Sequence, residues 1–278
     1  MRKRGEVKKR EAAGYPIAHW SHSSLIAFLR NPLAWRKRYV EKIYDIPSTP
    51  SGIIGRAGHK ALEHFYTGMG KEAAAALGLE YLRGVSDIDI AFGKAKTARA
   101  RREKRAHMER EYLQAIGFYL HRAPRHRVLG VEVRGTATIA GLPLPIKAIS
   151  DLVVESKVEP GAIDIVDHKF VDAFSKEQGE KTLFLIQALF NYHVVREQFG
   201  RPVRQFLVYE CKKRKNANGG AQLRRYALDF RTLDEEFQVF NRLLREATEE
   251  IARQRHYLPN PSDMFEGEHS FDIYRLKL

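Results

Sequence analysis

The chain has 278 residues, of which 44% are hydrophobic and 29% are charged, a composition typical of a soluble globular protein. No apolar run approaches the roughly 18 residues that a membrane-spanning helix needs, and the basic first ten residues are not followed by the apolar stretch of a secretion signal. Cys211 is the only cysteine, which excludes an internal disulfide or a cysteine cluster and favours the reducing cytoplasm.

The positive charge is concentrated in two short segments. The net charge is +14, and residues 1–10 and 94–110 carry +5 and +6 of it. Such clustering favours a polyanionic partner over a uniformly basic surface. The alternative is a disordered tail and a solvated helix face. For residues 94–110 we favour contact with phosphates.

The first part of the chain has a helical pattern. Residues 1–15 resemble a flexible basic tail, and Ser21 can cap the first helix. Asn31 and Pro32 have the residue types of a cap and a first helical position. A loop is expected at 47–52, followed by helices at 55–66, 71–82 and about 96–121.

The second part has the pattern of a sheet with helices. Strands are expected from residue 128 onward, at 146–155, 163–170, 205–210 and 223–228, with a helix at about 176–198. A final helix is predicted to start at Thr232, with Glu235 completing a capping box. The order predicts one mixed α/β domain over 16–278, with a helical front at 16–126, a sheet core at 127–230 and a C-terminal helix and tail at 231–278.

Three charged residues on two of these strands carry the chemistry. Asp167 and Lys169 are two apart on a strand and therefore share a face, whereas His168 points the other way. Asp151 precedes Asp167 by an interval that fits a hairpin turning at residues 160–161. Two carboxylates and a lysine suit metal-assisted phosphodiester hydrolysis, because carboxylate oxygens bind Mg²⁺ or Mn²⁺. By spacing alone, an ordinary exposed Asp–Lys pair remains an alternative.

The residues also resemble a known family. Asp151 followed by Asp167-His168-Lys169 is similar to the D…(D/E)-x-K signature of the PD-(D/E)XK nuclease superfamily. Residues 21–25 with Phe28 and Asn31-Pro32 resemble the opening of its RecB/AddB-like exonuclease branch, which is related to CRISPR-adaptation nucleases. Residues 55–63 resemble the G-x-x-x-H-x-x-L-E helix of that branch. Together these motifs span roughly residues 20–262.

This resemblance implies a fold and a set of roles. The fold would be a restriction-endonuclease-like α/β core, with a central mixed sheet flanked by helices. His59, Asp151 and Asp167 would bind Mg²⁺ or Mn²⁺, Lys169 would assist the nucleophile, and Gln187 would help to position the strand. Without the resemblance, a lone helical histidine such as His59 is usually a packed or surface residue.

Glu132 matches a recurring glutamate of this branch on the strand before Asp151. It is interpreted as a supporting or second-metal ligand, or equally as an ordinary charge on an edge strand.

The chain departs from the branch in three ways. Asn31 replaces the cysteine before the proline, and no cysteine follows the C-terminal segment, so no iron–sulfur cluster is expected. Tyr192 follows Gln187 by five residues rather than four, which places Asn191 at the usual position and leaves the role of Tyr192 open. The acid before the lysine is Asp, which the branch tolerates.

The resulting hypothesis is a metal-dependent DNA exonuclease of recombination, repair or phage DNA processing. It would act on DNA ends, in a bacterial cell or phage-infected host, and a recombination or helicase protein is a possible partner. The alternatives are a structure-specific or nicking endonuclease and a catalytically silent DNA-binding recombination partner. DNA contacts are expected from one helix side that carries Arg101, Arg102, Lys104 and Arg105. Trp20 and Trp35 could stack on bases, but packing in a core is favoured.

Overall fold

The computed structural model describes residues 14–43, 47–175, 181–216 and 219–258. These residues group into two compact units. The first unit draws on the segments Met1–Tyr44, Thr136–Lys147 and Glu235–Leu278, and the second on Asp45–Gly135 and Ala148–Asp234. That the chain behaves as a single domain stays a prediction.

The first unit is organised around two tryptophans. Its elements are β1 (Trp20–Ser21), α1 (His22–Arg30), α2 (Pro32–Trp35), a π-helical turn (Arg36–Val40) and α7 (Asp234–Ala252). Trp20 and Trp35 are fully buried and their rings stack 5.9 Å apart. The Trp20 Nε1 donates to Thr248 Oγ1 on α7 at 2.8 Å. The tryptophans are therefore core residues, and the expectation of core packing is confirmed.

The helix starts in this unit depend on side-chain caps. Ser21 Oγ accepts from the Ser24 N–H at 3.2 Å, and Asn31 Oδ1 accepts from the Ala34 N–H at 3.1 Å, so both predicted caps are confirmed. The capping box at the final helix is wrong. Thr232 ends a short 3-10 turn (Phe230–Thr232), where its hydroxyl donates to the Asp229 carbonyl, and α7 begins two residues later.

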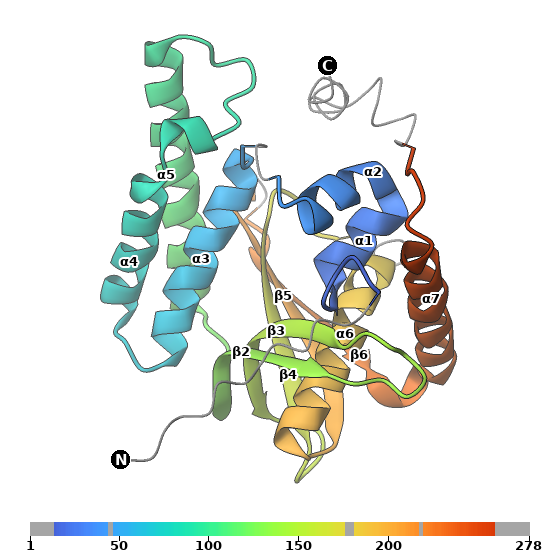
Figure 1. Ribbon diagram of the computed structural model, residues 1–278. Helices are drawn as coiled ribbons and strands as arrows, with labels where there is room; N and C mark the ends of the chain where they lie inside the picture. The colour runs from blue at the N-terminus through green and yellow to red at the C-terminus, as the bar shows by residue number, and fades with distance from the viewer. Residues whose placement is uncertain (1–13, 44–46, 176–180, 217–218, 259–278) are drawn as a thin grey trace, which may run out of the picture. The chain divides into compact units, whose positions relative to one another are not determined.

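Three helices form one layer of the second unit. They are α3 (Pro50–Tyr66), α4 (Lys71–Gly84) and α5 (Ala98–His121), which pack against one another (Figure 1). The 3-10 turn Asp87–Asp89 lies between α4 and α5 in the chain. The predicted loop at 47–52 is too long, because Thr49 Oγ1 caps α3 and Pro50 takes its first position.

A mixed sheet forms the other layer. Besides β1, the strands of this sheet are β2 (Val128–Ala137), β3 (Ile146–Glu155), β4 (Ile163–Val171), β5 (Val203–Lys212) and β6 (Leu223–Asp229). The strand order is β1-β3-β4-β5-β6, with β2 paired to β3. Pairing is antiparallel for β3–β4 and β5–β6 and parallel for β4–β5. The predicted α/β class, with a mixed sheet flanked by helices, is confirmed.

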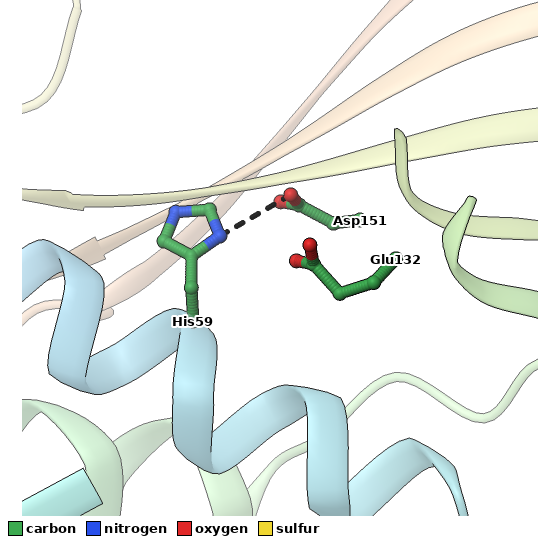
Figure 2. A group of neighbouring side chains, drawn as sticks. All are labelled: His59, Glu132 and Asp151. Carbon is green, nitrogen blue, oxygen red and sulfur yellow. Dashed lines mark ion pairs between the residues drawn. The ribbon is translucent and has the colours of Figure 1, made fainter. Parts of the chain in front are cut away.

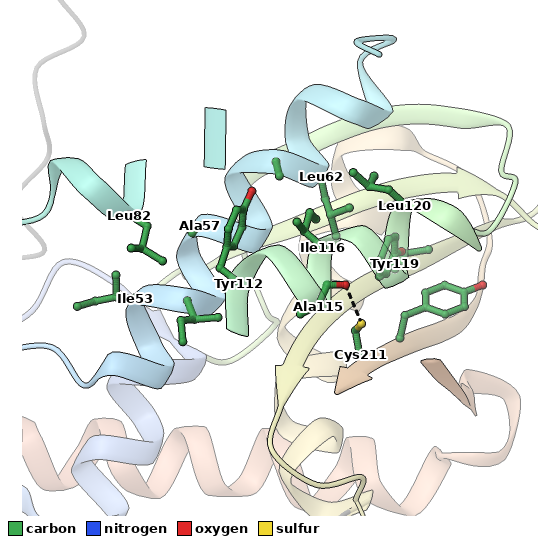
Figure 3. Packing of buried hydrophobic residues seen from close by; sticks show 14 of the residues in the cluster. Ile53, Ala57, Leu62, Leu82, Tyr112, Ala115, Ile116, Tyr119, Leu120 and Cys211 are labelled. Atoms are coloured by element: carbon green, nitrogen blue, oxygen red, sulfur yellow. Dashed lines mark hydrogen bonds between the residues drawn. The ribbon is translucent and has the colours of Figure 1, made fainter. Parts of the chain in front are cut away.

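Each face of this sheet has its own cover. On one face, Leu152, Val166 and Leu207 belong to a core cluster with buried residues of α3 and α5. Figure 3 shows Ala57 of α3 and Tyr112 of α5 in this cluster. The other face is contacted by α6 (Lys181–Phe199). The predicted start of this helix at residue 176 lies outside the described residues. Among the helices that the structure describes, none is long and apolar enough to cross a membrane.

Candidate functional site

One side of β4 carries the acid and the lysine of the motif. Lys169 Nζ lies 2.7 Å from Asp167 Oδ2, so the two side chains share a face as the strand period predicts. Gln187 on α6 joins them, because its Nε2 donates to Asp167 Oδ1 at 2.6 Å and its Oε1 accepts from Lys169 Nζ at 3.1 Å. His168 points to the opposite face, where its Nδ1 lies 2.9 Å from the Tyr119 hydroxyl.

Asp151 lies where the β3–β4 ladder opens. The described pairs between β3 and β4 begin with Glu155 opposite Ile163 and end with Leu152 opposite Val166. At the next position Asp151 Oδ2 accepts the His168 N–H at 2.7 Å, so a side chain replaces a backbone acceptor. Ser150 instead donates to Asn191 of α6 at 2.7 Å. Consecutive residues of β3 thus contact opposite layers, and the Asp151 carboxylate reaches the α3 side.

Three potential metal ligands meet at this opening. His59 from α3, Glu132 from β2 and Asp151 from β3 each offer one ligand atom, and these atoms lie within 4.8 Å of one another (Figure 2). His59 Nδ1 is 3.2 Å from Asp151 Oδ1. Gly58 lets α3 come this close to β4, because any side chain there would run into the Phe170 ring.

One comparison with known proteins identifies the family of the chain. The family profile described as "PD-(D/E)XK nuclease superfamily" matches residues 19–264. The chain belongs to the PD-(D/E)XK nuclease superfamily. A search of curated proteins finds no significant match. Among solved structures, the chain described as "Crystal structure of SSO0001" is 12% identical, with 85% of this chain and 87% of that chain covered and a TM-score of 0.27, too low to compare the folds.

The carboxylates of this candidate site set the charge of their neighbours. Burial acts to lower the pKa of His59, but the Asp151 carboxylate outweighs it and raises the pKa to about 9. Burial opposes the ionised form of Asp151, yet the His59 imidazolium holds its pKa well below the usual range. Burial, reinforced by Asp151, raises the pKa of Glu132. The cluster therefore combines one cation with negative charge that a divalent ion would neutralise.

Lys169 keeps its charge in this candidate site. Burial acts to lower the pKa of Lys169, but the adjoining Asp167 carboxylate outweighs burial and raises it. Burial raises the pKa of Asp167 itself, against the opposing charge of Lys169. The ammonium group is consequently a hydrogen-bond donor held in place by two acceptors.

The structure adds one residue to the predicted metal ligands. His59 and Asp151 lie together as expected, and Glu132 is the third member of their cluster. The Asp167 carboxylate contacts Lys169 and Gln187, and it also acts electrostatically on Asp151 and His59. Glu132 has a backbone φ of +48°, which is uncommon for a residue other than glycine. Sequence reasoning could not foresee this conformation, since nothing in the local pattern marks a bend there.

Two neighbours of Gln187 on α6 have different surroundings. Asn191 is buried, with its amide bonded to the Gln187 carbonyl and its Oδ1 accepting from Ser150. The Tyr192 hydroxyl accepts from Arg196, and its ring lies 4.7 Å from that of Phe230. Asn191 thus takes the position next to the site, and none of these described contacts joins Tyr192 to Asp167 or Lys169.

The basic side of α5 is partly engaged in local contacts. Arg105 forms an ion pair with Asp87 and donates to the Val85 carbonyl. The Arg101 guanidinium lies 5.6 Å from the centre of the Phe92 ring, whereas Arg102 is exposed. Arg105 therefore anchors the segment before α5, which weakens its suitability as a phosphate contact.

Proposed function

We propose that this chain is a metal-dependent DNA exonuclease whose divalent ion is held by His59, Glu132 and Asp151. The observation that carries the proposal is the convergence of three ligand atoms within 4.8 Å, beside the Asp167–Lys169 pair. One nitrogen and two carboxylate oxygens fit Mn²⁺ well and Mg²⁺ acceptably, because imidazole suits Mg²⁺ less than carboxylates do. The single cysteine leaves no set of thiolates for an iron–sulfur cluster within this chain.

The chain's own residues have separate roles in this proposal. A bound divalent ion would acidify a water and polarise the phosphate. His59 loses its proton to become a ligand, and Asp151 and Glu132 supply negative charge. Asp167 and Gln187 hold the Lys169 ammonium in one orientation, from which it donates to the phosphate as negative charge develops there.

The preference for DNA ends rests on the resemblance to the RecB/AddB-like branch. The same resemblance supports a role in recombination, repair or phage DNA processing, alone or with a helicase-type partner. The concentrated basic charge of the chain supports a nucleic-acid substrate.

Cleavage of end-labelled linear and covalently closed circular DNA tests the proposal. Reactions contain Mg²⁺, Mn²⁺ or EDTA, and they compare the natural protein with Lys169→Ala and with Arg242→Gln, a control in an exposed ion pair on α7. We expect release of label from linear DNA with Mn²⁺, stronger than with Mg²⁺, by the natural protein and the control only. Cleavage of the circle would identify an endonuclease instead. Cleavage by Lys169→Ala, or in EDTA, would refute the proposed site.

A further inference from the structure

A row of charged residues leads from Lys169 to the edge of the sheet. Lys169 on β4 is paired with Glu210 on β5, and Glu210 is paired with Arg224 on β6. Paired residues on neighbouring strands share a face, so all three side chains arise on the face contacted by α6. Strands lie about 4.8 Å apart, which places the Arg224 backbone roughly 10 Å from that of Lys169. This is a span of one or two nucleotides of an extended strand.

An aromatic ring lies at the outer end of this row. The Arg224 guanidinium is 4.6 Å from the centre of the Phe174 ring, and Lys212 Nζ is 5.8 Å from it. Phe174 and Arg224 also line a surface hollow of about 490 Å³. A half-buried ring with two cations beside it presents a flat apolar surface together with positive charge. Proteins that bind single-stranded nucleic acids use this combination.

The backbone next to Phe174 is fixed by a buried carboxylate. Glu210 is 1% exposed, and it accepts the Ser175 N–H at 2.8 Å and the Ser175 hydroxyl. The Tyr226 hydroxyl donates to the Ser175 carbonyl at 2.9 Å. A buried carboxylate destabilises the fold unless it is paired or hydrogen-bonded. The two hydrogen bonds from Ser175 offset this cost for Glu210. The position of Phe174 is therefore built into the fold beside the row that starts at Lys169.

We propose that Phe174 and Arg224 form a binding site for one unpaired nucleotide of the DNA substrate, next to the phosphate that is cleaved. The base stacks on Phe174, and Arg224 with Lys212 contacts the adjoining phosphate. Glu210 is a positioning residue that acts through Ser175. The inference rests on the proposed function in taking DNA as the ligand, and it deepens that function by naming the single strand as the substrate class.

The geometry favours a single strand over a duplex. Bases in a duplex are already stacked on their neighbours and cannot lie against a protein ring without leaving the helix. A single strand can turn its bases outward onto an aromatic side chain. A duplex would gain only from the cations, which contact phosphates without regard to strandedness.

Binding measurements in EDTA test this site without cleavage. The affinities of a labelled 12-nucleotide single strand and of a blunt duplex made of two complementary strands are compared for the natural protein, Phe174→Ala, Phe174→Leu and Phe174→Trp. We expect Phe174→Ala and Phe174→Leu to weaken single-strand binding roughly tenfold and duplex binding less than twofold. Phe174→Trp keeps an aromatic ring and should bind the single strand as the natural protein does. Arg242→Gln is the control for removal of a surface charge. Equal weakening for both DNAs, or none, would overturn the proposal.

A fluorescent base gives a readout specific to stacking. Single strands carrying 2-aminopurine at one of the first four positions from either end are bound to the same variants. We expect quenching at one or two adjacent positions, abolished in Phe174→Leu and reduced in Glu210→Gln. The absence of position-dependent quenching in the natural protein would refute base stacking. Quenching by a protein that cleaves no DNA with any divalent ion would instead refute the proposed function and leave this binding site standing.

Discussion

Substitutions at Glu132 can distinguish the effect of backbone strain on stability from the effect of metal binding. Its φ of +48° lies in the left-handed region, which costs an L-residue about 1–2 kcal/mol and glycine almost nothing. Glycine loses about 0.5–1 kcal/mol more chain entropy than alanine on folding. We therefore expect Glu132→Gly to be more stable than Glu132→Ala by roughly 0.5–1 kcal/mol.

The carboxylate of Glu132 also affects the free energy of unfolding. We expect it to lower stability without metal and to raise stability when metal is bound. Because burial and Asp151 raise the pKa of Glu132, its ionised form opposes folding at neutral pH. Without metal, both variants should be at least as stable as the natural protein. With Mn²⁺ at 100 times its Kd, the natural protein should gain about 2.7 kcal/mol, most of which should be absent in both variants.

Urea unfolding at pH 7, in EDTA and over a Mn²⁺ series, measures both effects. The matched control is Glu246→Ala, which removes an exposed carboxylate on α7. Two results would refute the reasoning. One is a Glu132→Gly protein no more stable than Glu132→Ala. The other is an unchanged Mn²⁺ gain in both variants, which would leave Glu132 as an ordinary edge-strand charge.

Three further predictions follow from other parts of the chain. Lys169→Ala should lower single-turnover cleavage on the order of 10²-fold or more and leave DNA affinity within about twofold, and near-natural cleavage would exclude Lys169 from the site. Replacing Arg101, Arg102 and Lys104 of α5 by glutamine should flatten the slope of log K against log salt by about 0.7–0.9 for each phosphate that the protein no longer neutralises, whereas an unchanged slope would exclude this surface. Burial, aided by Arg196, lowers the pKa of His193 to about 4, below its unfolded value of 6.5, so stability is complete above pH 6.5 and falls as the unfolded chain takes up the proton. Between pH 7 and pH 5 the natural protein should lose about 2 kcal/mol more in urea unfolding than His193→Gln, and equal losses would contradict the assigned shift.

The sequence predicted the elements well where a local signal exists. Strand alternation placed Asp167 and Lys169 on one face and His168 on the other, and the structure has this arrangement. The caps at Ser21 and Asn31 are local too, since each needs only a side-chain oxygen three residues before an N–H. The capping box at the start of α7 fails because Thr232 belongs to a 3-10 turn, so the helix begins at Asp234 and not directly after the threonine.

Features that depend on irregular backbone could not be predicted. A regular hairpin would pair Asp151 with Asp167, but the described ladder ends at Leu152–Val166, and the Asp151 side chain accepts the His168 N–H and contacts His59 of α3. The bend at Glu132 likewise has no marker in the sequence, since glycine is the usual residue at positive φ. The sequence therefore identified the residues of the candidate site, but it did not predict that Glu132 would lie with His59 and Asp151 as a third potential ligand.

The two irregularities explain why the candidate site has two halves. Asp167, Lys169 and Gln187 contact one another on the α6 side of the sheet, and Asp167 also acts electrostatically on Asp151 and His59. Asp151 at the ladder opening and Glu132 with its positive φ lie beside His59, and the ligand atoms of the three residues are within 4.8 Å of one another. Strained backbone persists only where the surrounding structure compensates for its cost. Within the proposed function, a divalent ion supplies that compensation, and the lysine half needs none, so metal removal should loosen the His59 half first.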